Sequence, residues 1–144
     1  CIWQVVKWGK HVITISVDGE EIVTERQGWA VIANCKSYAR GLNPAKNADI
    51  ADGAIDVIFL PMKSRIKLFW WLFLMLRGKH VQHSSSVYAR GKQIIVSVHE
   101  ASHWQLDGDA IGAKIQMELA CVPNSLLVFS GELGSAPKGN APKH

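Results

Sequence analysis

Short runs of β-branched and aromatic residues, separated by turn signals, occupy most of this chain and constrain its fold more than any other feature. These runs predict strands over 2–8, 11–17, 20–25, 29–34, 55–60, 87–89, 92–98, 104–106, 114–122 and 125–129. Asp18-Gly19 and Asp107-Gly108 are typical of two-residue hairpin turns, because Gly tolerates positive φ. We therefore expect hairpin-connected strands along most of the chain.

One segment departs from this pattern and is typical of a helix. Ser64 has the side chain of a helix N-cap, and Gly78 is a C-terminal stop signal. The apolar run Leu68–Leu76 between them is too short to cross a bilayer, which takes roughly 20 residues. Many strands with one helix predict a mainly β fold, a β-sandwich with one inserted α-helix.

Length and composition indicate a single domain. The chain has 144 residues, 48% of them hydrophobic, which is enough for one core. We assign residues 1–130 to the β-sandwich and expect residues 131–144, rich in Gly, Pro, Ala and Lys, to form a disordered tail. Lys and Arg number 16 against 12 Asp and Glu. This mild excess is compatible with anionic lipid or phosphate, and we expect no nucleic-acid partner.

The cysteines argue against two classes of site. Cys1, Cys35 and Cys121 are an odd number at wide spacing, without a Cys-x-x-Cys pair. A disulfide framework and a thiolate zinc site are therefore not expected. Reduced thiols, and the lack of a signal peptide in this sequence, favour a cytoplasmic protein.

Histidines offer two candidate metal patterns. His99-Glu100-Ala101-Ser102-His103 matches the HExxH pattern of zinc proteases, which requires a helix. Here it continues a predicted strand, where residues four apart lie about 13 Å from each other, so chance turn residues are favoured. His80 and His83 could be a metal pair, but solvated or phosphate-facing histidines are the better interpretation. The sequence has no P-loop, GxGxxG or GxSxG motif.

A long loop over 37–52 leads into an acidic stretch that contains Asp49, Asp52, Gly53 and Asp56. Long ordered loops in compact domains are usually functional. Carboxylates and loop carbonyls are ligands for hard cations, whereas a turn with solvated acids is the simpler alternative. The residues alone leave both interpretations open.

Five short motifs follow one another along the chain. They are Asn34 at a strand end, Tyr38-Ala39-Arg40-Gly41, Asp52-Gly53-Ala54-Ile55-Asp56-Val57, Leu76-Arg77-Gly78-Lys79-His80 and Leu106-Asp107-Gly108-Asp109. This succession resembles the carboxy-terminal domain of the diacylglycerol kinase catalytic family, which also includes sphingosine and ceramide kinases. The resemblance runs from about Trp29 to Phe129.

The resemblance implies one half of an ATP-dependent lipid kinase. In the family, a preceding nucleotide-binding domain carries a GGDGT motif, and ATP phosphorylates a lipid hydroxyl in the cleft between the domains. GGDGT is absent here. The resemblance therefore implies a substrate domain for a diacylglycerol-like lipid, inactive alone, whose partner is the missing N-terminal domain. The alternative is a non-catalytic lipid-binding or interaction module that retains the fold.

The resemblance also implies site residues. A structural Mg²⁺ would bind the Asp52 carboxylate and the backbone carbonyls of Asp49 and Ala54, while ATP-Mg would bind mainly to the missing domain. Family members use the Glu of an Asp-Gly-Glu hairpin as general base on the lipid hydroxyl. The matching residue is Asp109, whose side chain is one methylene shorter than Glu.

The predicted helix is apolar on every face, and cations flank it. Lys63, Arg65 and Lys67 precede the apolar run, and Arg77, Lys79 and His80 follow it. The missing domain, a second copy in a homodimer, or a bilayer must cover what a small sandwich leaves exposed. Cations and Trp suit the headgroup region. We predict that Trp70 or Trp71 touches the membrane, and hence a cytoplasmic protein with peripheral membrane association.

Overall fold

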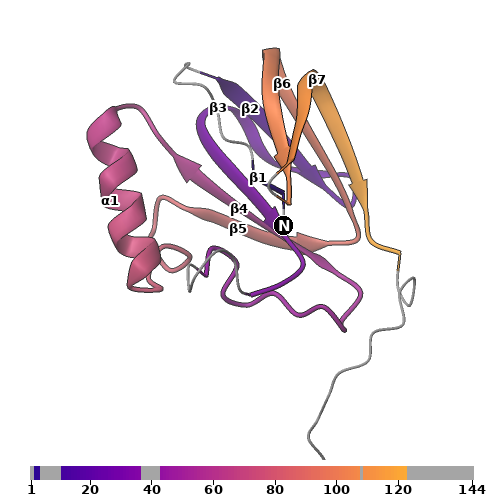
Figure 1. The fold of residues 1–144 in the computed structure, drawn as a ribbon, viewed down its shortest axis with the longest axis horizontal. Coiled ribbons are helices and arrows are strands. Elements are labelled where there is room, and N and C mark those ends of the chain that lie inside the picture. The colour runs from indigo at the N-terminus through magenta and orange to yellow at the C-terminus, as the bar shows by residue number, and fades with distance from the viewer. Residues whose placement is uncertain (1, 4–10, 37–42, 108, 123–144) are drawn as a thin grey trace, which may run out of the picture.

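The computed structural model describes residues 2–3, 11–36, 43–107 and 109–122. The elements in chain order are β1 (Ile2–Trp3), β2 (Val12–Val17), β3 (Glu20–Ala33), β4 (Ile55–Pro61), α1 (Arg65–Leu76), β5 (Val87–Gly91), β6 (Gln93–Leu106) and β7 (Asp109–Ala120) (Figure 1). The predicted mainly β architecture, with one inserted helix among the described residues, is confirmed. Within this part of the chain, no helix is long and apolar enough to cross a membrane.

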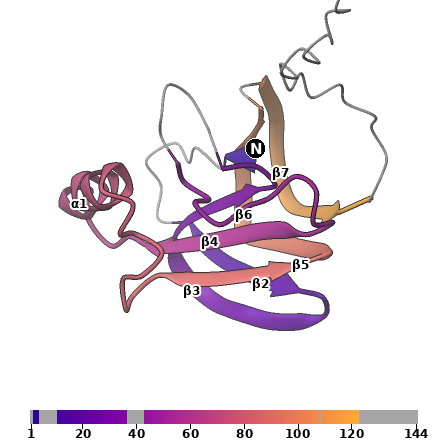
Figure 2. The same ribbon diagram turned by 90° about the horizontal axis from the view of Figure 1, so that it is seen from below.

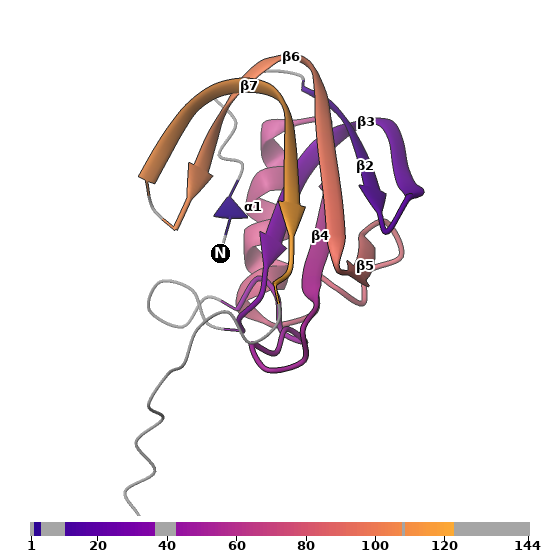
Figure 3. The same ribbon diagram turned by 90° about the vertical axis from the view of Figure 1, so that its right-hand side faces the viewer.

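The strands form one antiparallel sheet that turns back on itself. Its order is β1-β6-β2-β3-β4-β5, with β7 paired to β6. Strand β1 pairs with β6 on one side and with β3 on the other, so it joins two parts of the sheet that face each other. Figure 3 shows β6 and β7 arching over the remaining strands. Alternate side chains of β2, with Ile13, Ile15 and Val17 buried, fill the space inside.

Strand β4 is buried on both faces. Val57 and Phe59 contribute to the core inside the sheet, whereas Ile58 and Leu60 contribute to a second core beneath α1. Gly28 of β3 allows the close approach, because a Cβ at this position would lie 2.4 Å from the Phe59 ring. Viewed nearly end-on, α1 lies outside the sheet (Figure 2).

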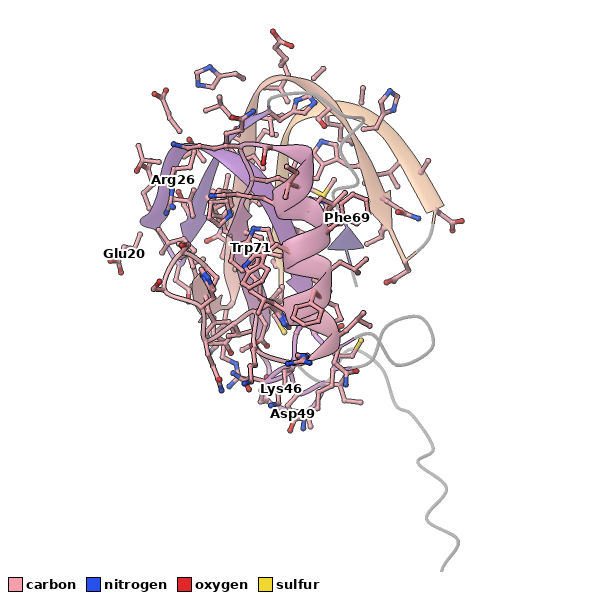
Figure 4. The ribbon with its side chains drawn as sticks, turned by 90° about the vertical axis from the view of Figure 1, so that its left-hand side faces the viewer. Glu20, Arg26, Lys46, Asp49, Phe69 and Trp71 are labelled. Atoms are coloured by element: carbon pink, nitrogen blue, oxygen red, sulfur yellow. The ribbon has the colours of Figure 1, made fainter. Side chains whose placement is uncertain are left out.

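Helix α1 attaches to the sheet through one stripe of side chains. Trp71, Leu74 and Met75 are buried in the second core, and the Trp71 Nε1–H donates a hydrogen bond to the Pro61 carbonyl at 2.9 Å. Figure 4 shows Trp71 pointing toward the sheet and Phe69 pointing away from it. Of the two tryptophans predicted to touch a membrane, Trp71 is therefore excluded, because its side chain is only 3% exposed, whereas Trp70 is 50% exposed and stays a prediction.

Two strands are longer than the local sequence predicts. Strand β3 runs through Thr24-Glu25-Arg26, where the pairing with β2 shifts and Glu25 adopts φ 45°. A bulge thus accommodates the polar residues that were expected to end the strand. Strand β6 likewise continues through His99–His103, with a shift in its pairing to β7. These histidines lie on a strand and not in the turn that the sequence favoured, and they lack the helical spacing of a zinc protease.

Other predictions fall wholly or partly outside the described residues. Of the strand predicted over 2–8, Ile2 and Trp3 are described and form β1, and the rest lies outside the described residues. The strand predicted over 125–129 and the tail predicted over 131–144 lie outside the described residues. Strand β7 begins at Asp109 instead of Lys114, because the two-residue turn after Leu106 starts the hairpin immediately.

Candidate functional site

The segment of residues 43–54, which precedes β4 and which we call the acidic loop, folds over the helix-side face of β4. Ala45 and Ala48 are fully buried and pack in the second core with Ile58 and Leu60. The loop is thus anchored by small side chains that bring its backbone close to the sheet. This anchoring fixes the position of Asp49–Ala54, the segment predicted to hold a cation.

A buried histidine ties the loop to the end of α1. Gly78 adopts φ 63° and turns the chain after the helix, so that His80 points inward. The fully buried His80 ring donates through Nε2–H to the Pro44 carbonyl at 2.6 Å. The prediction of a solvated or phosphate-facing His80 is therefore wrong. His83 is partly buried too, with its ring edge-on to Trp71 at 5.0 Å.

The two loop aspartates close local turns. The Asp49 Oδ1 accepts the Ala51 N–H, and the Asp52 Oδ1 accepts the Ala54 N–H, each at 3.0 Å. Gly53, between Asp52 and Ala54, adopts φ 68°. Such Asx turns hold the carboxylates beside the backbone of the same loop.

Arg90 joins the loop to the sheet. It lies opposite Asp56 in the β4–β5 pairing, and its guanidinium forms ion pairs with the Asp52 carboxylate and, at 3.7 Å, with Asp56. Tyr88 Oη–H donates a hydrogen bond to the Asp56 Oδ1. Asp56 itself is fully buried, and its Oδ2 accepts no hydrogen bond. The Arg90 ion pair is thus the charge partner of that oxygen.

Burial sets the protonation behaviour of this cluster. Desolvation raises the pKa of Asp56 above its ordinary value, and the hydrogen bond from Tyr88 partly offsets the rise. Desolvation also raises the pKa of Tyr88 to about 12, with the Asp56 hydrogen bond and charge acting in the same direction. A side-chain hydrogen bond with Asn47 acts the other way. The phenol therefore remains protonated, as a donor to Asp56.

Asp109 lies at the tip of the β6–β7 hairpin. It is the first residue of β7, pairs with Leu106, and has an exposed side chain. Asp107, within the turn, adopts φ 49°, which is the conformation that a two-residue hairpin turn requires. The carboxylate of Asp109 is thus accessible to a substrate that approaches this end of the molecule.

The strand pairings place the Asp109 hairpin and the acidic loop at the same end of the sheet. Leu106 of β6 pairs with Ile2 of β1, Ile2 pairs with Ile32 of β3, and Ile32 pairs with Val57 of β4. Neighbouring strands are about 5 Å apart, so these steps add up to at most roughly 15 Å between Leu106 and Val57.

A shallow depression lies at this same end. It is lined by Cys35 and Lys36, which follow β3, and by Ala48, Asp49 and Ile50 of the loop. This end of the sheet therefore carries the Asp109 hairpin, the acidic loop, and an open depression between the end of β3 and that loop.

The loop fits a hard cation in the chemistry of its donors. The implied ligands are all oxygens, namely the Asp52 carboxylate and the carbonyls of Asp49 and Ala54, as Mg²⁺ and Ca²⁺ prefer. No group of three His, Cys, Asp or Glu side chains suited to a metal occurs among the described residues, but this donor set needs only one carboxylate. A bound cation would share that carboxylate with Arg90.

Sequence reasoning missed three residues of the site. Arg90 and Tyr88 lie more than thirty positions from Asp56, and only the β4–β5 pairing brings them to it. His80 was noticed for its spacing to His83, although its role depends on Pro44. No local motif carries these contacts, since each depends on strand register or on how the loop folds.

Comparison with known proteins identifies the family. Residues 1–130 match the family model of the YegS C-terminal NAD kinase beta sandwich-like domain. The chain belongs to this family. It is thus the carboxy-terminal type of domain found in diacylglycerol kinase-like lipid kinases, and the resemblance drawn from the sequence is confirmed.

Individual relatives support this assignment. The chain is 30% identical over 113 residues to the diacylglycerol kinase of Mycobacterium tuberculosis. This alignment covers 78% of this chain and 36% of that protein. It is 25% identical over 100 residues to a Bacillus subtilis protein named "Putative lipid kinase YtlR", covering 69% and 32%. The chain therefore spans about a third of the length of these relatives.

Solved structures share the fold. A protein of Bacillus anthracis str. Sterne, described as "a putative diacylglycerol kinase", has a TM-score of 0.61 at 16% identity, covering 78% of this chain and 37% of its own. A second structure from the same organism has a TM-score of 0.60 at 18% identity, covering 83% and 40%.

We predict that the pKa of Tyr88 is about 12, well above that of an ordinary tyrosine. Between pH 10 and about 12 the unfolded chain loses this proton before the folded chain does. The contribution of Tyr88 to the unfolding free energy is therefore fully present below pH 10 and lost as the pH rises through about 12. Denaturant melts across this range should show the fall in the wild type and a smaller fall in Tyr88→Phe. An equal fall in both proteins would contradict the assignment.

Proposed function

We propose that this chain is the lipid-substrate domain of an ATP-dependent kinase that phosphorylates the hydroxyl of a diacylglycerol-like lipid. The observation that carries the proposal is the shared sheet end, which holds both the exposed Asp109 hairpin and the anchored acidic loop. Family membership supports it. The nucleotide would be held mainly by an amino-terminal domain, because this sequence contains no phosphate-binding motif.

Asp109 is proposed as the general base. Its carboxylate accepts the proton of the lipid hydroxyl while that oxygen forms a bond to the γ-phosphorus of ATP. The bond from the γ-phosphorus to the β–γ bridging oxygen breaks, and ADP leaves. Exposure at a hairpin tip suits this role, since the substrate must reach the carboxylate from outside the domain.

The acidic loop is proposed to hold a structural Mg²⁺. Asp52 would bind it through its carboxylate, and Asp49 and Ala54 through their carbonyls. When bound, the ion would brace the loop and add positive charge near the transferred phosphoryl group. The chain itself contributes the Arg90 ion pairs and the His80 hydrogen bond, which hold the loop against the sheet.

The cellular setting follows from the proposed substrate. A diacylglycerol-like lipid resides in a bilayer and ATP in the cytoplasm. We therefore propose a cytoplasmic protein with peripheral membrane association, in which the amino-terminal domain is the main protein partner.

A non-catalytic lipid-binding module is the second candidate. Two observations favour it: Asp109 is one methylene shorter than the Glu implied by the family, and Arg90 already pairs with the Asp52 carboxylate. A misplacement of about 1 Å can cost a base much of its effect. Turnover by the full-length protein distinguishes the two candidates.

Mg²⁺ should raise the melting temperature of the full-length protein in the absence of nucleotide, and Asp52→Ala should abolish most of that rise. A ligand at 100 times its Kd stabilises by about 2.7 kcal/mol, a shift of several degrees. Each variant is compared with its own metal-free melt, because Asp52→Ala also loses the Arg90 pair.

Asp49→Ala is the matched variant for this test. It removes a carboxylate from the same loop but keeps the backbone carbonyl, so most of the Mg²⁺ shift should remain. An unchanged shift in Asp52→Ala would remove this carboxylate from the proposed site.

Asp109→Asn in the full-length protein should lower lipid phosphorylation about 10²–10⁴-fold with little change in ATP affinity, since a base acts in the transition state. Asp109→Glu, which restores the longer side chain, should retain or raise turnover. Glu100→Gln removes an exposed carboxylate elsewhere on the hairpin and serves as control. Near-normal turnover in Asp109→Asn would exclude Asp109 from the mechanism.

A further inference from the structure

Helix α1 presents a wide apolar surface that no described residue covers. Successive residues of a helix are rotated by about 100°, which places Trp71, Leu74 and Met75 together toward the sheet. The opposite side spans about 160° and, apart from the Arg65 position in the first turn, is apolar. We call it the outer face, and its side chains are exposed by 43–81%: Ile66, Phe69, Trp70, Leu72, Phe73 and Leu76.

This surface differs from scattered apolar exposure. A helix on the surface of a domain normally turns a polar stripe to water, and contiguous apolar patches mark interaction sites. On the outer face the rings of Trp70 and Phe73 lie 6.1 Å apart, and Phe73 also contacts Arg77. The outer face is therefore an interaction surface that another apolar surface covers.

Positively charged side chains lie at both ends of the outer face. Lys63 and Lys67 are exposed at the start of α1, and Arg77 and Lys79 at its end. The Arg77 guanidinium lies 4.6 Å from the centre of the Phe73 ring. The sequence from Val57 to His99 contains no Asp or Glu but seven Lys and Arg residues. The charged residues that flank this face in the sequence are therefore all cations.

These charges favour one occupant over another. A second copy packed face to face would bring these flanking cations close to their like-charged counterparts. An anionic bilayer instead offers hydrocarbon for the rings and headgroup charge for the cations, as interfacial helices use them. We propose that the outer face of α1 docks on an anionic lipid bilayer, with Trp70 and Phe73 inserted at the headgroup boundary.

The docking surface adjoins the proposed site, and the proposal deepens the proposed function, on which its biological purpose rests. The C-terminal end of α1 leads to His80, which binds Pro44 of the acidic loop. Gly78 lies beside the Lys46 side chain of the same loop. A bilayer held on the outer face therefore meets the acidic loop at headgroup level, where the hydroxyl of a diacylglycerol-like lipid is found.

The test measures binding of the full-length protein to vesicles of neutral phosphatidylcholine, with and without phosphatidylserine, by co-sedimentation and tryptophan fluorescence. The wild type should bind the anionic vesicles. Trp70→Ala/Phe73→Ala should bind at least about tenfold more weakly, because the variant loses two aromatic side chains whose exposed halves would be buried in the bilayer. Ile115→Ala/Val122→Ala, which truncates two exposed apolar residues elsewhere, should bind like the wild type.

A charge variant checks the second half of the argument. Lys63→Gln/Lys79→Gln should weaken binding to the anionic vesicles and reduce its dependence on salt, while its fold is unaffected because both side chains are exposed. Unchanged binding and salt dependence in this variant would overturn the electrostatic part of the proposal.

The docking proposal is overturned if the wild type does not bind, or if Trp70→Ala/Phe73→Ala binds equally well. In either case the outer face is covered by another domain or by a second copy. Kinase activity on detergent-dispersed lipid separates the two proposals. Activity without vesicle binding would contradict only the docking proposal. Vesicle binding without activity would contradict only the proposed kinase function.

Discussion

The burial of strand β4 on both faces is the constraint on which the rest of the structure depends. Its hydrogen-bonded partners β3 and β5 remove the backbone from water, while Phe59 and Leu60 face two different cores. Helix α1 and the loop before β4 are required to cover the outer of these faces. Asp56 lies in the same strand, so its carboxylate is desolvated and must be paired through Tyr88 and Arg90.

This pairing extends the core into the candidate site. Arg90 also binds Asp52, so the buried charge and the acidic loop are held by one guanidinium. At the other end of the same loop, His80 binds Pro44 and follows the last turn of α1. The loop is thus connected both to the sheet and to the helix whose outer face is proposed to meet lipid. Strand β1 then links this region to the Asp109 hairpin through its two pairings.

Much of the architecture was predictable from local patterns. The strand at 55–60 and the helix bounded by Ser64 and Gly78 follow from β-branched runs and cap signals, and the structure has both. The long strands β3 and β6 were not predictable as single elements, because bulges at Glu25 and after Ser97 carry polar residues that resemble turns. The contacts of Arg90 and His80 depend on register and loop packing, to which a local motif is blind.

Transfer of labelled phosphate to lipid is the most direct test of the account. The full-length protein is incubated with Mg²⁺, γ-labelled ATP and vesicles that contain diacylglycerol or other lipids with a free hydroxyl. The account predicts that label appears in a phosphorylated lipid and depends on both substrates. If the full-length protein binds ATP and vesicles yet labels none of the lipids, the kinase assignment is contradicted, and the chain is a lipid-binding module.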